Sequence, residues 1–197
     1  MSFEIICFLS AITRKEEILI RAAALFRIKG YSATTMRDIA RDVGMEAASL
    51  YNHISSKQLI LSDLLMELAQ LFTEGMETIS HSPISDLEKL EELIKLHVDL
   101  TMSHTDAISL LPSEWVHLEE PQHKEFLILK DAYERKFKII IAAVIAEGNQ
   151  SDIDPDVTLF SILSTLRWLY SWQSKYKVED IEKLKADLVQ NLIYGLR

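Results

Sequence analysis

Cysteine, glycine and proline are scarce in this sequence, which has one cysteine, five glycines and four prolines among its 197 residues. A single cysteine excludes an internal disulfide, so the composition fits a reducing, cytoplasmic location. The few glycines and prolines, with no tract rich in either, exclude a fibrous or low-complexity chain. We therefore expect a compact globular protein of the cytoplasm.

Long apolar runs and targeting signals are also missing. No apolar run reaches the length of about 18 residues that a membrane span needs, and no repeat of about 20 to 50 residues is visible. The apolar opening MSFEIICFLSAI carries Glu4 and has no basic residue before it, which is unlike a secretory signal. We expect residues 1–12 to form an N-terminal extension, and we expect no membrane partner.

The signatures of common enzymes and metal sites are absent as well. The sequence contains no nucleophile elbow, no glycine-rich phosphate loop and no HExxH motif. Of its six histidines, His97 and His104 form one neighbouring pair and His117 and His123 another, but neither pair has the i, i+4 spacing of a helical metal clamp. We therefore predict no catalytic residues, no cofactor and no metal.

The net charge of −9 argues at first against a nucleic-acid partner, because contacts to phosphate groups need lysine and arginine. The charge is unevenly distributed, however. Residues 1–57 hold 8 basic and 6 acidic residues, whereas residues 58–197 hold 13 basic and 24 acidic ones. The mildly basic N-terminal part can therefore approach DNA, since the acidity belongs to the rest of the chain.

Apolar residues recur at helical spacing along most of the chain, and no segment alternates as a strand would. Helix starts are marked by pairs typical of capping boxes, at Thr13 with Glu16, Thr35 with Asp38, and Ser85 with Glu88. The sequence predicts an all-α fold of about nine helices, with a three-helix head at residues 13–57 and a helical body at residues 58–197.

The body is predicted to begin with a long helix that Ser55 or Ser56 caps. A second helix runs from Ser85 to near His104, and one or two short helices follow before Pro121. The remaining helices are expected from Pro121 to Gly148, from Asp154 through Leu169, and along a final stripe of isoleucine and leucine, namely Ile181, Leu184, Leu188 and Leu192.

The most informative segment is TTMRDIARDVGMEAASLYNHISSK, residues 34–57. Its pattern predicts a short helix, a turn at Gly44 and a second short helix, which is how a helix-turn-helix is built. Preceded by RAAALFRIKGYSATT, the segment resembles the DNA-binding domain of the TetR family over about 45 residues. The matching positions are Ala22, Leu25, Phe26, Gly30, Tyr31, Thr34, Ile39, Ala40, Gly44, Met45, Ser49, Leu50, Tyr51, His53, Ser56 and Lys57.

The resemblance implies a set of residues that face DNA. Helix N-termini at Thr35 and Lys57 suit phosphate, and Ala47 and Ala48 occupy positions where methyl groups can meet thymine. Glu46 either accepts from a cytosine or favours the positive helix end, and Arg37 either binds phosphate or pairs with an aspartate. The complete set is Thr35, Arg37, Glu46, Ala47, Ala48, Ser49, Tyr51, Asn52, His53 and Lys57.

The resemblance also implies that the last two long helices form a homodimer and that the body holds a small-molecule effector. Aromatic residues of TLRWLYSW, residues 165–172, occupy more than one helix face, which favours a partner helix over simple core packing. A two-fold dimer would bind double-stranded operator DNA with an inverted repeat. The residues implied to line the effector pocket are His97, Met102, Trp115, His117, Tyr133 and Phe137.

The nature of the effector is left open by the sequence. The stretch ISLLPSEWVHLEEPQHKEF, residues 108–126, is similar to a TetR subgroup that responds to acyl-CoA thioesters. We therefore expect a repressor that a thioester releases from its operator. A repressor of an efflux pump that senses hydrophobic compounds is the alternative, and a helical scaffold without DNA binding is a third interpretation.

Overall fold

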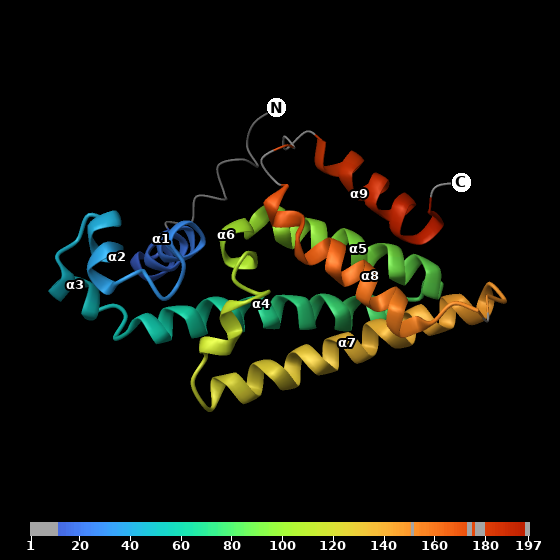
Figure 1. Ribbon diagram of the computed structural model, residues 1–197, viewed down its shortest axis with the longest axis horizontal. Helices are drawn as coiled ribbons and strands as arrows, with labels where there is room; N and C mark the ends of the chain where they lie inside the picture. The colour runs from blue at the N-terminus through green and yellow to red at the C-terminus, as the bar shows by residue number, and fades with distance from the viewer. Residues whose placement is uncertain (1–11, 151, 173–174, 176–179, 196–197) are drawn as a thin grey trace.

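The computed structural model describes residues 12–150, 152–172, 175 and 180–195. Within these ranges the chain forms nine α-helices and no strand, which confirms the predicted fold class. Cys7 and almost all of the predicted N-terminal extension lie outside the described residues. Figure 1 shows the three N-terminal helices at one end of the molecule and the helices that follow them beside one another at the other.

The head consists of α1 (Arg14–Lys29), α2 (Met36–Asp42) and α3 (Ala47–Tyr51). The capping boxes expected at Thr13 and Thr35 are both present, and each side chain accepts a hydrogen bond from the backbone N–H three residues on. After α1 and α2 the chain turns at Gly30 and Gly44, whose φ angles of 85° and 67° favour glycine because a β-carbon is strained there.

A single hydrophobic cluster holds the head together and continues into the body. Ile18 and Phe26 of α1 pack with Ile39 of α2 and Leu50 of α3, and all four are at most 2% exposed. The same cluster includes the first turns of α4 (Lys57–Ser80) and three residues from farther along the chain, Leu110, Leu118 and Phe126. The head therefore shares packing with the segment that leads into α7.

Four long helices and several short elements make up the body. After α4 come α5 (Asp86–Ser103), α6 (Thr105–Ile108), the 3₁₀ turn η2 (Glu114–His117) and α7 (Gln122–Glu147). The chain ends with α8 (Pro155–Arg167), η3 (Leu169–Ser171), α9 (Ile181–Val189) and the π-helical turn η6 (Gln190–Tyr194). Helix α4 packs on α1, α5, α6 and α7, so it connects the head to the body. Among the described residues, no helix is both long and apolar enough to cross a membrane.

Helix α8 is shorter than the sequence predicts, since it ends at Arg167 rather than continuing through Leu169. At Trp168 the backbone leaves the α conformation, with φ −95° and ψ 0°, and a 3₁₀ turn follows. This tighter turn brings Leu169 into a small core with Val98 of α5 and Leu184 of α9. Packing on neighbouring helices thus overrides the regular spacing of apolar residues.

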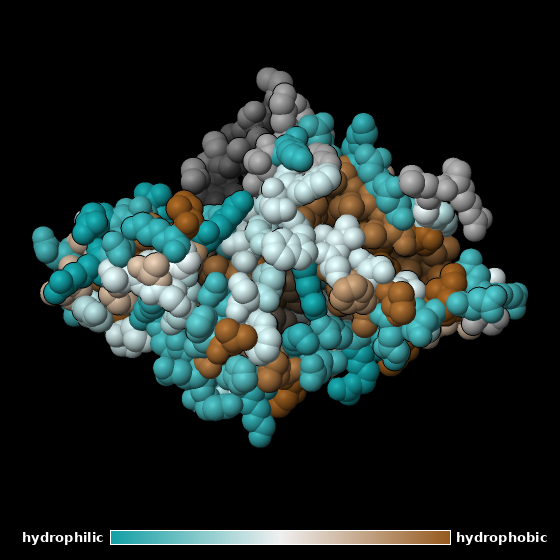
Figure 2. Space-filling view, in the orientation of Figure 1, coloured by the Kyte–Doolittle hydropathy of each residue, from teal (hydrophilic) through white to brown (hydrophobic). Residues whose placement is uncertain are grey.

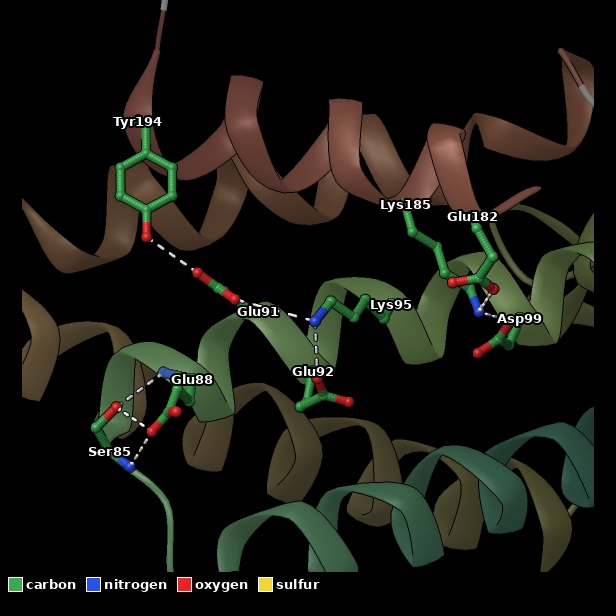
Figure 3. Close-up of polar contacts among 9 residues, drawn as sticks. All are labelled: Ser85, Glu88, Glu91, Glu92, Lys95, Asp99, Glu182, Lys185 and Tyr194. Atoms are coloured by element: carbon green, nitrogen blue, oxygen red, sulfur yellow. Dashed lines mark hydrogen bonds and ion pairs between the residues drawn. The ribbon is translucent and has the colours of Figure 1, made fainter. Parts of the chain in front are cut away.

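Two polar contacts hold α9 and the turn that follows it against α5 (Figure 3). The Lys185 ammonium pairs with the Asp99 carboxylate at 2.7 Å, and the Tyr194 hydroxyl, just beyond α9, donates to the Glu91 carboxylate at 3.0 Å. Val189 packs between these contacts, in the body core with Leu93 and Ile94 of α5. The last helix therefore lies on α5. Helix α8 exposes Val157 and Phe160 to solvent.

Candidate DNA-binding face and ligand cavity

The second helix of the helix-turn-helix presents a row of exposed side chains. Leu50 is fully buried against the head core and Ala47 is half-buried, whereas most of the predicted DNA-facing residues are exposed, namely Thr35, Arg37, Glu46, Ala48, Ser49, Tyr51, Asn52 and His53. Glu46 makes no side-chain capping bond at the start of α3. Leu50 thus anchors α3 in the head, and the exposed side of α3 is open to a DNA duplex.

Helix α2 carries two arginines with different surroundings. The Arg41 guanidinium lies 3.7 Å from the Asp38 carboxylate, which Thr35 also engages by donating its hydroxyl hydrogen at 2.6 Å. Arg37 is exposed and has no ion pair with any residue of the described ranges. Arg41 therefore pairs with an aspartate, whereas Arg37, for which the sequence left both alternatives open, is available for phosphate.

Lys57, a predicted DNA contact, bonds to the backbone of the head. Its ammonium donates to the backbone carbonyls of Tyr31 at 2.7 Å and Thr34 at 2.8 Å, and lies 4.3 Å from the centre of the Tyr31 ring. Removal from water lowers the pKa of the Lys57 ammonium from its usual value. Lys57 therefore holds the turn that precedes α2, and a contact to phosphate stays a prediction.

The body contains a largely apolar cavity with a volume of about 130 Å³. Its walls come from α4, α5, α7 and α8 and from the segment between α6 and α7. Most of its lining side chains are apolar, namely Ala69, Phe72, Ile108, Leu111, Pro112, Trp115, Phe126, Leu129, Leu163 and Leu166. Such a cavity suits an apolar group of about the size of benzene, which a cavity of roughly 150 Å³ is known to bind.

A neutral polar pair lies in the wall of this cavity. The His97 ring nitrogen Nε2 is 2.9 Å from the Tyr133 hydroxyl, and the Phe72 ring lies 4.6 Å from the His97 ring, measured between centroids. Burial, helped by the positive charge of Arg167, lowers the pKa of His97 to about 3, and burial raises the pKa of Tyr133. Both side chains are therefore uncharged at neutral pH.

Charged side chains gather at another part of the cavity wall. Arg167 of α8 pairs with Glu134 of α7, and the Lys130 ammonium lies 3.3 Å from the same carboxylate. All three side chains are partly exposed, so this group marks the mouth of the cavity. Lys130 also lies 3.6 Å from the Asp131 carboxylate, so two cations and two carboxylates meet at this mouth.

Of the six side chains expected to line a pocket, His97, Trp115 and Tyr133 line this cavity and the other three do not. Met102 faces a separate groove between α1 and α6, and His117 stacks on Tyr31 at 5.3 Å. Phe137 is fully buried in the core behind His97. These displacements arise because helical spacing does not reveal how far each helix is rotated about its axis.

The buried His97 should make unfolding depend on pH. Its pKa is about 3 when folded and about 6.5 when unfolded, so protons bind the unfolded chain more tightly. This contribution to stability is complete above pH 6.5 and is lost as the pH falls towards 3. We expect the free energy of unfolding to fall by up to about 1.4 kcal/mol per pH unit in that window, as measured by urea titration.

A His97→Gln variant should lose this pH dependence, because glutamine can bond Tyr133 but does not titrate. His53→Gln, at an exposed histidine, is the matched control and should keep it. Equal pH slopes for the wild type and His97→Gln would refute the assignment.

Comparison with known families bears on both parts of the molecule. Residues 18–64 match the model for bacterial regulatory proteins of the tetR family, and residues 83–193 match the tetracyclin repressor-like C-terminal domain. A curated relative, the HTH-type transcriptional repressor KstR2 of Mycolicibacterium smegmatis, is 27% identical over 162 residues, which cover 79% of each chain.

Two solved structures share the fold. The ketosteroid transcriptional regulator KstR2 of Mycobacterium tuberculosis has a TM-score of 0.80 and 24% identity, covering 91% of this chain and 94% of that one. AibR, in complex with isovaleryl coenzyme A and operator DNA, has a TM-score of 0.74 and 22% identity, covering 94% of this chain and all of the other. The helix-turn-helix head and the helical body thus define a DNA-binding transcriptional regulator, not an enzyme. The chain belongs to the TetR family.

Proposed function

We propose that this regulator is a repressor that binds an inverted-repeat operator as a two-fold dimer, and that a short-chain acyl-CoA thioester releases it. The observation that carries the proposal is the apolar cavity of about 130 Å³ with two cations at its mouth. The known relatives support it, because a curated one is a transcriptional repressor and a structural neighbour was solved with isovaleryl coenzyme A and operator DNA.

The size of the cavity favours a short acyl group. An acyl group of about five carbons or a single aromatic ring fills a volume close to that of benzene, whereas a steroid ring system needs several times more space. A larger ligand would therefore have to displace Trp115 or Phe72. Each methylene that leaves water contributes about 0.8 kcal/mol to binding, so even a short chain gains appreciable affinity here.

The charges at the mouth favour an anionic group on the same ligand. Arg167 and Lys130 can bind phosphate oxygens in exchange for the carboxylates of Glu134 and Asp131, which pair with them in the structure. The thioester carbonyl then lies nearest the polar part of the wall, where Tyr133 and His97 supply hydrogen-bonding groups. A hydrophobic drug, as in an efflux-pump repressor, would use the apolar walls but not the cations.

A panel of ligands tests this proposal. We expect isovaleryl-CoA and other short acyl-CoA thioesters to raise the melting temperature, whereas the free acids and long-chain thioesters have little effect. Arg167→Gln should weaken thioester binding about tenfold or more, because it removes a charge-assisted contact of about 1.5–3 kcal/mol. Arg135→Gln, at an exposed arginine of α7 that does not line the cavity, is the matched control.

The other outcomes decide between the alternatives. Release of DNA by hydrophobic drugs, with every thioester inert, would replace the acyl-CoA assignment with an efflux-type sensor. Failure of the wild-type protein to enrich any duplex from a random library would favour a helical scaffold. In either case the acyl-CoA assignment is wrong, and Arg167→Gln no longer tests how a thioester is recognised.

A further inference from the structure

The one-turn helix η2 touches both the ligand cavity and the DNA-binding head. Trp115 of η2 lines the cavity. His117, two residues on in the same turn, stacks on Tyr31 of the head with 5.3 Å between ring centroids and 29° between ring planes. A displacement of this short element therefore alters contacts at both places.

Gln58, in the first turn of α4, joins η2 to the head through two hydrogen bonds. Its side-chain oxygen accepts from the Tyr31 hydroxyl at 2.7 Å, and its side-chain nitrogen donates to the backbone carbonyl of His117 at 2.8 Å. Tyr31 is only 8% exposed, and its backbone carbonyl receives the bond from Lys57 described above. One glutamine side chain thus spans the head and the wall of the cavity.

Helix η2 is held by few other contacts. None of its four residues is buried, and no side chain caps it. Its contacts include Trp115, which packs on the head cluster and stacks on His123 at 5.8 Å, the bond from the Glu114 backbone N–H to the Leu110 carbonyl at 2.8 Å, and the bond from Gln58 to His117. A weakly held turn between two ordered parts can shift at low cost when the cavity is filled.

We propose that Gln58 is the positioning residue that couples the cavity to the head. This coupling would regulate transcription only if the protein is the ligand-released repressor proposed above. A group that fills the cavity presses on Trp115 in its wall and shifts η2 slightly, so the His117 carbonyl moves away from Gln58. Tyr31 then loses its stacking on His117 and the fixed position of its Gln58 acceptor. The turn at residues 31–34, which Lys57 holds, shifts together with the start of α2. The recognition helices leave the spacing that the operator requires.

A double-mutant cycle tests the coupling without any ligand. Operator affinity is measured on a duplex that the wild-type protein selects from a random library. We expect Trp115→Ala, which detaches η2 from the cavity wall, to change the dissociation constant fivefold or more. In a Gln58→Leu background the same change should alter it less than twofold. Gln70→Leu is the control, because Gln70 bonds Glu74 within α4 and no other described residue, and it should preserve the full response.

Hydrogen exchange supplies a readout that needs no DNA. Amide exchange at residues 31–34 should quicken in Trp115→Ala, and Trp115→Ala should produce no further change once Gln58→Leu is present. Circular dichroism shows whether each variant is folded. Additive effects in the two backgrounds, or no effect of Trp115→Ala in the wild-type background, would overturn the proposal. Because no thioester is used, failure of the acyl-CoA assignment would leave this result intact.

Discussion

A Phe160→Glu substitution is expected to convert the protein from a dimer to a monomer and to weaken operator binding at least a hundredfold. Phe160 is 73% exposed and lies in a stripe of apolar residues on the free side of α8 and its continuation, which also includes Ile153, Val157, Trp168 and Trp172. Val157 and Phe160 are three residues apart on one face of α8, while Ile153 precedes the helix and the two tryptophans follow its end. Apolar residues gather around α8 and α9 in Figure 2.

The expected loss follows from symmetry and linkage. In a two-fold interface each substitution occurs twice. Dimer formation would therefore bury two unpaired carboxylates in an apolar interface, which is costly. Two heads that are joined bind two half-sites about 10² to 10⁴ times more tightly than one head binds alone. A monomer would therefore lose at least the lower of these factors.

Sedimentation and fluorescence anisotropy measure the two effects on one sample. Ile128→Glu, at a residue of α7 that is 59% exposed, is the matched control and should remain dimeric with full affinity. A Phe160→Glu protein that still sediments as a dimer would show that the interface lies elsewhere.

Ala48→Glu is expected to abolish specific operator binding while leaving the fold intact. Ala48 is exposed in the middle of α3, and Leu50 on the opposite side anchors that helix in the head. A carboxylate at this position would face the phosphates of the major groove, and such like-charge contact costs several kcal/mol, or more than a hundredfold in affinity. Glutamate suits a helix, so the melting temperature should change little.

Ala48→Gln separates the effect of charge from that of size. Glutamine has nearly the same shape as glutamate but no charge, so we expect it to retain operator affinity within about tenfold. Anisotropy titrations at two salt concentrations measure both variants. Equal losses for the two would indicate a steric effect, and unchanged binding by Ala48→Glu would remove α3 from the DNA interface.

The head was predictable from sequence because its signals are local. A capping box needs two residues three positions apart, and a turn such as that at Gly44 needs a residue that tolerates positive φ. The residues that form each signal lie within a few positions of one another, so their spacing in the sequence specifies the helix start or the turn. The start of α4 at Ser56 and the start of α8 at Asp154 follow the same logic, since each side chain caps its helix as predicted.

The cavity was harder to predict because its residues come from helices far apart in sequence. Phe72 was missed as a lining residue, and nothing in its local spacing shows that it meets Tyr133 of α7. The internal role of Lys57 was missed for a similar reason. Its partners are backbone carbonyls of a distant turn, which every residue possesses.

The energetics of release are modest and within reach of a small ligand. A tenfold change in operator affinity corresponds to about 1.4 kcal/mol of difference between the free energies with which the ligand binds the two conformations. Burial of four methylene or methyl groups supplies about 3 kcal/mol in total. About half of that gain must depend on the conformation, which is possible only if the cavity changes shape with the position of the heads.

Operator affinity with the cavity empty and with it filled tests the central claim most directly. Fluorescence anisotropy on the selected duplex should give nanomolar binding by a dimer and a duplex sequence with an inverted repeat. Isovaleryl-CoA, at a concentration that saturates its thermal shift, should then weaken that binding at least tenfold. An operator affinity that stays the same while isovaleryl-CoA saturates the cavity would contradict the account.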